Sequence, residues 1–319
     1  MYRLRLAPDD TNIKFMRGRY AGLIVSAVLS IASVILFFYP GLNKGIDFVG
    51  GIVIEARTPQ TSDFPALRAS LGQLGLGQVA LQQFGSVQDV LIRFERQAGG
   101  DQAQQKAVEK VRVALAKDFA GTQIRRVEAV GASVSDELFR NGMLALGLAI
   151  VAMLFYIWFR FEWQFGLGAV ITLLLDVTKT VGFYAVTDLQ FNLTAIAAIL
   201  TIMGYSINDK VVVYDRVREN LRIYKKMPLR DLIDRSINET LNRTLGTSMT
   251  VFLACLPLAL FGGEALEEFA WVLLFGIVVG TSSSIFIAAP LLLFLGEGRL
   301  RRGTAKETET VEVTDSAAP

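Results

Sequence analysis

The apolar run FGLGAVITLLLDVTKTVGFYAVT at residues 165–187 decides the fold class of this chain. It is long enough to cross about 30 Å of hydrocarbon as a helix, yet it holds Asp176 and Lys179 in its interior. A charge at the centre of a spanning helix costs about 2.5–3.5 kcal/mol, so such residues usually face a bundle interior and line an ion or proton path. The next apolar run carries Asn208, Asp209 and Lys210 near its end. Both runs therefore favour a transport function.

Similar runs recur along the 319-residue chain, in which 52% of the residues are hydrophobic. The mean hydropathy of +0.42 is too high for an ordinary soluble domain. Candidate spans lie at about 20–39, 142–160, 165–187, 191–213, 245–262 and 269–295. We expect a polytopic α-helical membrane protein with six transmembrane helices. The first run is interpreted as a retained anchor, because Tyr39-Pro40-Gly41-Leu42 follows it instead of a small-x-small cleavage site.

Lys and Arg gather in three places: the N-terminal tail 1–19, the segment 214–244 and the tail 297–319. The short connections 188–190 and 262–268 contain neither residue. Because positively charged loops stay in the cytoplasm, we expect both termini to be cytoplasmic. The tail 297–319 is polar and is expected to be disordered.

The cytoplasmic segment 214–244 has an amphipathic pattern. After Pro228, apolar residues recur every four positions, at Leu229, Ile233, Ile237, Leu241 and Leu245. This spacing predicts a helix with one apolar stripe, which we expect to lie along the membrane face.

Two counts limit the chemistry. The chain has no His and a single Cys, Cys255. Metal sites built on imidazole and His-based proton relays are therefore excluded, the domain outside the membrane has no disulfide, and carboxylates would have to carry protons. We expect no metal and no cofactor.

Residues 40–141 form a polar segment between the first two spans. Alternating patterns predict strands at 52–57, 78–84, 90–95 and 123–130, and helices at 64–74 and 101–119, with Asp63 and Asp101 as caps. The order βαββαβ is that of an α+β ferredoxin-like domain, here expected on the periplasmic side. No catalytic set or phosphate-binding loop appears in it. We expect a docking or substrate-handling module and not an enzyme.

A glycine-rich motif, Gly45-Ile-Asp-Phe-Val-Gly-Gly51, leads into this domain. Glycines Gly45, Gly50 and Gly51 around Asp47 and Phe48 predict a tight, extended turn where backbones approach closely. The alternative is a simple hinge into the first strand.

This motif, the ferredoxin-like pattern and the stretch Gly204-Tyr-Ser-Ile-Asn-Asp-Lys-Val-Val-Val-Tyr-Asp-Arg-Val-Arg-Glu-Asn220 together resemble the SecF family of protein-export membrane proteins. That family belongs to the SecD/SecF group of the resistance-nodulation-division superfamily. The resemblance implies a heterodimer with SecD that uses the proton-motive force to assist translocation after the SecA-driven step. The implied partners are the SecYEG translocon, possible further small membrane subunits and unfolded preprotein, with no nucleic acid.

The resemblance also implies a proton relay. Asp209 matches the acid on the fourth span of the family, Asp176 matches an acid on the third, and Arg243 matches an arginine that can face an ionised Asp. Alternatives remain open: Asp176 neutralised by Lys179 in an i,i+3 pair, Asp209 as a solvated helix-end residue, and Arg243 as a positive-inside anchor.

Several neighbours could tune the relay. Asn208 stands beside Asp209, and the hydroxyls of Tyr205 and Ser206 could support it. Lys179 and Lys210 depart from the family pattern and could either tune or quench the acids.

Two other functions fit the same sequence. One is a stand-alone half-transporter of the superfamily that exports a lipid or small molecule, and an apolar pocket in the outer domain would favour it. The other is a passive translocon scaffold that does not consume the proton gradient.

Overall fold

The computed structural model describes residues 11–59, 62–77, 79–84, 86–95, 97, 99–161, 163–262 and 264–295. The predicted disordered tail and most of the N-terminal tail lie outside these residues. The chain divides into two compact units. The membrane unit contains the described parts of 1–42, 147–189 and 197–319, and the outer unit contains those of 43–146 and 190–196.

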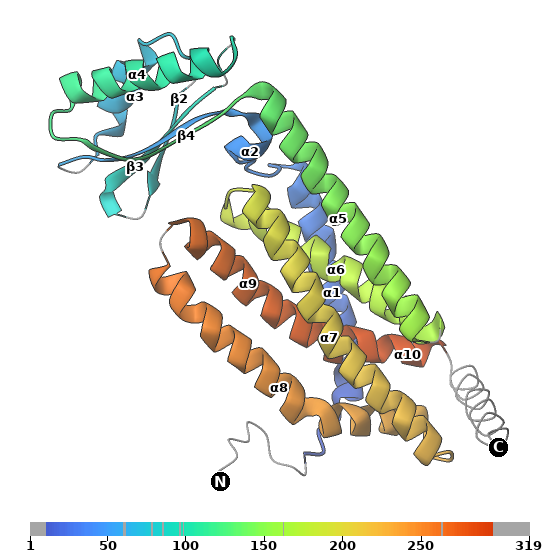
Figure 1. Ribbon diagram of the computed structural model, residues 1–319. Helices are drawn as coiled ribbons and strands as arrows, with labels where there is room; N and C mark the ends of the chain where they lie inside the picture. Colours follow the sequence, from blue (N-terminus) through green and yellow to red (C-terminus); the bar gives the residue numbers. More distant parts are fainter. Residues whose placement is uncertain are drawn as a thin grey trace, which may run out of the picture. The chain divides into compact units, whose positions relative to one another are not determined.

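Six helical segments of the described chain are long and apolar enough to cross a membrane, which confirms the predicted number (Figure 1). They comprise η1 (Phe15–Gly18) with α1 (Arg19–Phe38), α5 (Ala132–Arg160), α6 (Trp163–Thr187), α7 (Leu193–Ile223), α8 (Leu229–Phe261), and α9 (Glu264–Ser283) with η2 (Ser284–Ala288) and α10 (Ala289–Leu295). The protein is therefore a multi-pass membrane protein.

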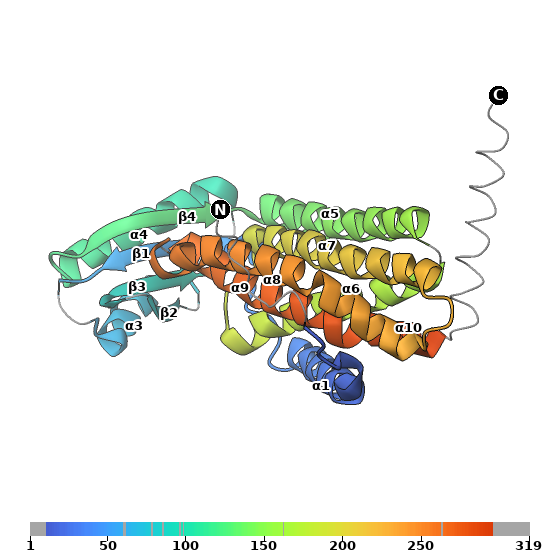
Figure 2. The same cartoon turned by 90° about the horizontal axis from the view of Figure 1, so that it is seen from below.

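The central helices of the membrane unit are α6, α7 and α9. In each of these three spans, half or more of the most apolar stretch is buried inside the protein. In the spans of α1, α5 and α8 the buried share is 17%. Small residues permit this packing. A Cβ added at Gly280 of α9 would lie 3.2 Å from Cβ of Ser206, and one added at Gly182 of α6 would lie 2.8 Å from Cα of Ser33. Helix α1 runs beside α6 in the same direction (Figures 1 and 2).

The last span contains a π-helical segment, η2, between α9 and α10. A π-helix is rare and often marks a functional position. Here it begins at Ser284, directly after Ser283, and Pro290 follows it. Tyr214 on α7 donates a hydrogen bond to the carbonyl of Ala288 at 3.0 Å, which links α7 to this irregular stretch.

The amphipathic segment 214–244 is divided between two longer helices, and its placement along the membrane face stays a prediction. Its first part extends α7 to Ile223, and its second part belongs to the continuous helix α8. The stripe of Leu229, Ile233, Ile237 and Leu241 is buried inside the membrane unit. Packing against protein satisfies an apolar stripe as well as lipid does, and the polar side is held by ion pairs from Arg216 and Arg235 to Glu239.

The outer unit contains a four-stranded antiparallel sheet in the order β2-β3-β1-β4, which confirms the ferredoxin-like topology. Its elements are β1 (Gly51–Arg57), α3 (Phe64–Gly72), β2 (Val79–Phe84), β3 (Ser86–Phe94), α4 (Gly100–Asp118) and β4 (Gln123–Val130). Alternate residues of β1 and β3, such as Ile54 and Ile92, pack with Leu67 of α3 and Val111 of α4 in one core.

Two local predictions in this domain have different outcomes. Asp63 caps α3 as expected, because its Oδ1 accepts a hydrogen bond from Ala66 N at 3.1 Å. Asp101 is not the cap of α4, because the helix begins at Gly100 and Gly99 holds the cap position. Gly99 has φ of 120°, a conformation that glycine adopts far more readily than Asp. Strand β3 begins at Ser86, four residues earlier than predicted.

Candidate functional site

Asp176 lies at the centre of a buried polar cluster in the membrane unit. Its side chain is 1% exposed. Oδ2 accepts hydrogen bonds from Lys210 Nζ at 2.8 Å, Ser206 Oγ at 2.7 Å and Ser283 Oγ at 2.7 Å, while Oδ1 faces Lys179 Nζ at 3.5 Å. One carboxylate therefore ties α6, α7 and α9 together.

The two lysines of the cluster are held differently. Lys210 is fully buried, and besides Asp176 its ammonium contacts Ser206 Oγ, the Ser206 carbonyl at 3.2 Å and Ser283 Oγ at 3.2 Å. Lys179 is 5% exposed, and within the described residues its ammonium has one contact, at 3.5 Å from Asp176 Oδ1. Lys210 is thus a well-bonded ammonium, whereas Lys179 is sparsely bonded.

Asp209 follows Ser206 on α7 by about one helical turn, and it belongs to a second polar group that is rich in hydroxyls. Its side chain is 1% exposed, and it accepts one long hydrogen bond, from Thr281 Oγ1 at 3.4 Å. Thr281 is 2.7 Å from Ser248 Oγ, to which Tyr205 donates at 2.6 Å. These residues form a hydroxyl chain across α7, α8 and α9 that ends at Asp209.

Three residues predicted around the relay are placed differently by the structure. Ser206 donates to Asp176 and not to Asp209, and Tyr205 is linked to Asp209 through Ser248 and Thr281. Asn208 is exposed, because adjacent helical residues point about 100° apart. Arg243 is exposed and forms no ion pair with Asp209 within the described part of the chain, but it is close enough to interact with the charge of Asp209.

Sequence reasoning did not assign Ser283, Thr281 and Ser248 to the site. The run Thr281-Ser-Ser-Ser284 follows Gly276-x-x-x-Gly280, a spacing that favours close helix approach. Gly276 and Gly280 pack against Ile202 and Ser206 of α7. The available signal was four consecutive hydroxyl residues inside an apolar run.

The glycine-rich motif has a structural role in the outer unit. It contains a one-turn helix, α2 (Ile46–Val49), so the predicted extended turn is wrong. Gly45 N donates to the Phe191 carbonyl at 2.9 Å, and Asp47 Oδ2 accepts from Leu193 N at 3.1 Å, at the start of α7. Phe48 is buried beside Phe191. The motif therefore fastens this segment to the connection before α7.

The two last glycines of the motif explain how the chain leaves α2. Gly50 has φ of 73° and Gly51 has φ of 129°, values that residues with a Cβ rarely adopt. Together they turn the backbone directly into β1.

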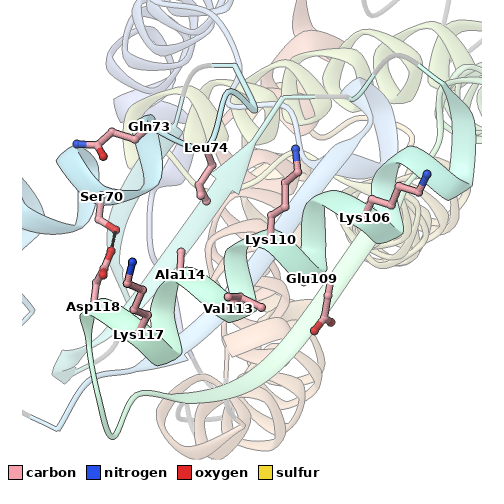
Figure 3. A pocket seen from close by; sticks show the side chains of 10 residues that line it. All are labelled: Ser70, Gln73, Leu74, Lys106, Glu109, Lys110, Val113, Ala114, Lys117 and Asp118. Carbon is pink, nitrogen blue, oxygen red and sulfur yellow. Dashed lines mark hydrogen bonds between the residues drawn. The ribbon is translucent and has the colours of Figure 1, made fainter.

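The outer unit also has a concave surface between α3 and α4, with a volume of about 690 Å³ (Figure 3). Leu74, Val113 and Ala114 form its apolar part. Polar side chains surround them: Lys106, Lys110, Lys117, Glu109, Asp118, Ser70 and Gln73. Ser70 donates to Asp118 at 2.6 Å across one end. It is a mixed groove and not an apolar pocket.

Six spanning helices, an outer ferredoxin-like domain and a buried cluster of acids and lysines define a membrane transport subunit. The family model described as "Protein export membrane protein SecD/SecF, C-terminal" matches residues 110–298, and the one described as "SecD/SecF GG Motif" matches residues 35–60. The chain belongs to the SecD/SecF family of protein-export membrane proteins.

Individual relatives agree with this assignment. The chain is 45% identical over 303 residues to protein translocase subunit SecF of Rickettsia bellii, covering 95% of this chain and 99% of that one. It is 43% identical over 303 residues to the SecF subunit of Rickettsia prowazekii, covering 95% and 97%.

Solved structures of SecDF are also similar. SecDF of Thermus thermophilus, described as a translocon-associated membrane protein, has a TM-score of 0.81 and 32% identity over 91% of this chain. A SecDF structure in a super-membrane-facing form has a TM-score of 0.63 and 30% identity over 99% of this chain. The chain spans 39% and 41% of those two SecDF chains.

Proposed function

We propose that this chain is a SecF-type subunit of the Sec accessory complex in a bacterial inner membrane, where it works with SecD. The complex uses the proton-motive force to assist polypeptides across the membrane after the ATPase-driven step. The observation that carries this proposal is Asp209, a buried carboxylate with one weak hydrogen bond beside a well-bonded ion cluster. The SecF relatives and the SecDF structures support the same role.

Asp209 is the better proton carrier of the two acids. A carrier has to exist in both a charged and a neutral form. Asp176 accepts from two hydroxyls and faces two ammonium groups, so hydrogen bonds and counter-charges surround its carboxylate. Among the described residues Asp209 has one 3.4 Å hydroxyl contact, and Lys210 and Arg243 act on its charge without a direct ion pair, so burial is compensated less at Asp209 than at Asp176.

The membrane potential supplies enough energy for such a relay. One charge moved across the membrane yields about 2.3 kcal/mol for each 100 mV. This is close to the cost of one poorly compensated carboxylate in a bundle. Protonation of Asp209 can therefore shift the balance between two arrangements of the helices. In one of them, Arg243 of α8 would approach Asp209 as its counter-charge.

The exposed face of α7 is the proposed contact with SecD. Ala197, Thr201, Gly204 and Asn208 recur on this face, and all four are exposed. Small residues allow helices to approach closely in a membrane. Because this chain spans about two fifths of SecDF, a separate SecD chain would complete the assembly. SecYEG and unfolded preprotein would be the further partners, and both termini would be cytoplasmic.

The groove between α3 and α4 bears on the alternative of lipid or small-molecule export. An enclosed apolar pocket in the outer domain would favour that function, but three lysines and two acids surround this groove (Figure 3). A mixed surface of this kind suits transient contact with a polypeptide better than capture of a lipid.

Co-purification combined with an export assay tests the proposal. The tagged chain is expected to isolate SecD from membranes and to restore the export of a secreted reporter in cells that lack their own SecF. A chain that binds no SecD and restores no export would contradict the assignment. Restored export that does not depend on the proton gradient would favour the passive scaffold instead.

A further inference from the structure

The sparse bonding of Lys179 is the feature of the cluster that the proposed relay leaves unexplained. An ammonium has three donor hydrogens, and this one has a single acceptor at 3.5 Å. Lys210, by comparison, has an acceptor at 2.8 Å and two more at 3.2 Å. Since Lys210 alone neutralises Asp176, the charge of Lys179 is an addition that Asp176 does not require.

Charge balance in the bundle connects Lys179 to Asp209. With Asp209 ionised, its charge and that of Asp176 cancel the charges of Lys179 and Lys210. When Asp209 takes up a proton, the same four residues carry an excess positive charge. An uncompensated charge in a low-dielectric interior is strongly unfavourable. The excess disappears if one lysine becomes a neutral amine, and Lys179 is the one held by fewer contacts.

We propose that Lys179 is a second proton-exchanging residue, which releases a proton as Asp209 takes one up. This inference rests on the proposed function of Asp209. In one step, a proton from water bonds to a carboxylate oxygen of Asp209. In the compensating step, an N–H bond of the Lys179 ammonium breaks, its electron pair stays on Nζ, and the proton passes to water. The four residues are then electrically neutral together in both states.

The surroundings of Lys179 permit both protonation states. The charged groups that act on it are Asp176 on its own helix and Lys210 on α7; Lys210 and Arg243 of α8 act in turn on the charge of Asp209. The polar groups of the helices packed against α6 are hydroxyls: Ser26, Ser30 and Ser33 on α1, Thr281 and Ser283 on α9, and Ser284 on η2. A hydroxyl can accept from an ammonium and donate to an amine.

One of these hydroxyls stands level with Lys179. Ser33 packs against Gly182, and α1 and α6 run in the same direction (Figure 1). Ser30 lies three residues before Ser33, and Lys179 lies three residues before Gly182. Each step is about 4.5 Å along its helix at 1.5 Å per residue, so Ser30 is level with Lys179. The hydroxyls of Ser30 and Ser26 are buried without a hydrogen-bond partner in the described structure. Ser30 provides an unused polar group at the level of the lysine, and Ser26 provides another about one helical turn further along α1.

Nitrogen NMR of the full chain in lipid bilayers tests the proposal, because the ¹⁵N signal of a lysine distinguishes amine from ammonium. Lys179→Met assigns the signal. Asp209→Asn mimics the protonated acid, and we expect it to raise the amine fraction of Lys179 at least fivefold at the same pH. Asp215→Asn is the matched control, because Asp215 is an exposed residue on the same helix. A Lys179 that stays an ammonium in both variants would overturn the proposal.

A functional assay provides the second test. Arginine keeps its charge but cannot release a proton. We expect Lys179→Arg to lower the gradient-dependent export rate at least fivefold, and we expect the same of Lys179→Met. Normal export by Lys179→Arg would mean that Lys179 is a fixed charge, which contradicts the proposal.

These experiments distinguish a failure of the proposed Asp209 function from a failure of the Lys179 proposal. If Asp209→Asn exports normally, the proposed function is wrong whatever the NMR result. If Asp209→Asn is inactive but the Lys179 ammonium is unchanged, only the present inference is wrong.

Discussion

Lys210 Nζ of α7 lies 2.8 Å from Oδ2 of Asp176 on α6, and neither side chain is more than 1% exposed. The residues are 34 positions apart in the chain. Two hydroxyls, from Ser206 and Ser283, complete the bonding of the carboxylate. The pair therefore fixes how α6 is rotated against α7, and it gives the buried carboxylate a directly bonded counter-charge.

Removing one partner of this pair should be costly. Lys210→Met leaves Asp176 with only the distant Lys179 as counter-charge, and we expect a loss of about 3–5 kcal/mol of stability. Thermal unfolding of the purified protein in detergent measures it. The double variant Asp176→Asn, Lys210→Met should recover most of the loss, since no unpaired carboxylate remains. A double variant as unstable as the single one would show that the pair does not carry the stability.

The hydroxyl of Ser283 should matter far more than that of its neighbour. Ser283→Ala removes a 2.7 Å hydrogen bond to a charged group, which we expect to cost about 1.5–3 kcal/mol. Ser282→Ala is the matched control, because Ser282 is exposed and donates only to the Val279 carbonyl. The comparison uses the same thermal unfolding. Equal effects of the two substitutions would argue against a role for Ser283 in holding Asp176.

The contact of α1 with α6 depends on Gly182. A Cβ at this position would lie 2.8 Å from the backbone of Ser33, so Gly182→Ala should push α1 away and lower the stability by about 1–3 kcal/mol. Gly204→Ala, where no atom lies within 4 Å of the added Cβ, should be neutral or stabilising by up to about 1 kcal/mol. Unfolding midpoints that fall equally in both variants would contradict the packing argument.

The outer domain should lose stability in acid through Asp89. Arg57 donates to it twice at 2.7 Å, Ser86 donates at 2.7 Å, and Arg125 lies 3.5 Å away. The hydrogen bonds from Arg57, followed by that from Ser86, lower the pKa of Asp89 from 3.8 to about 2. Because the folded pKa is the lower one, the stabilisation is complete above about pH 4 and is lost as the pH falls toward 2.

Asp89→Asn should remove this contribution already at neutral pH. We expect a loss of about 1 kcal/mol, since Arg57 is partly exposed and solvent screens the pair. Amide hydrogen exchange in β1 and β3 of the full chain, corrected for intrinsic rates, measures it between pH 6 and 3. Glu109→Gln, an exposed carboxylate on α4, should change nothing. Faster exchange in β1 for both variants at pH 6 would count against the pair.

Patterns local in sequence predicted much of the fold. Hydropathy gave the six spans, alternation gave the strands, and the i,i+3 spacing predicted that Lys179 faces Asp176. The contact of Lys210 with Asp176 was not predictable, because it depends on how two helices are rotated against each other. Likewise, adjacency suggested that Asn208 would serve Asp209, but the helix directs it outward.

The roles of Ser283, Thr281 and Ser248 could not be predicted from the sequence either. Each hydroxyl comes from a helix other than that of the acid it serves, so only the packed bundle brings them together. The exposure of Arg243 shows the limit of reasoning from a family pattern, which identifies a residue but not its position relative to Asp209 in one arrangement of the bundle.

The central claim is that Asp209 couples export to the proton gradient. Its most direct test is the rate of reporter export by membrane vesicles containing the SecD complex, measured with and without an uncoupler. For the native chain and for Asp215→Asn, we expect the uncoupler to slow export. Asp209→Asn should export at the slow, uncoupled rate under both conditions. An Asp209→Asn complex that still exports fast and still slows with the uncoupler would contradict the account.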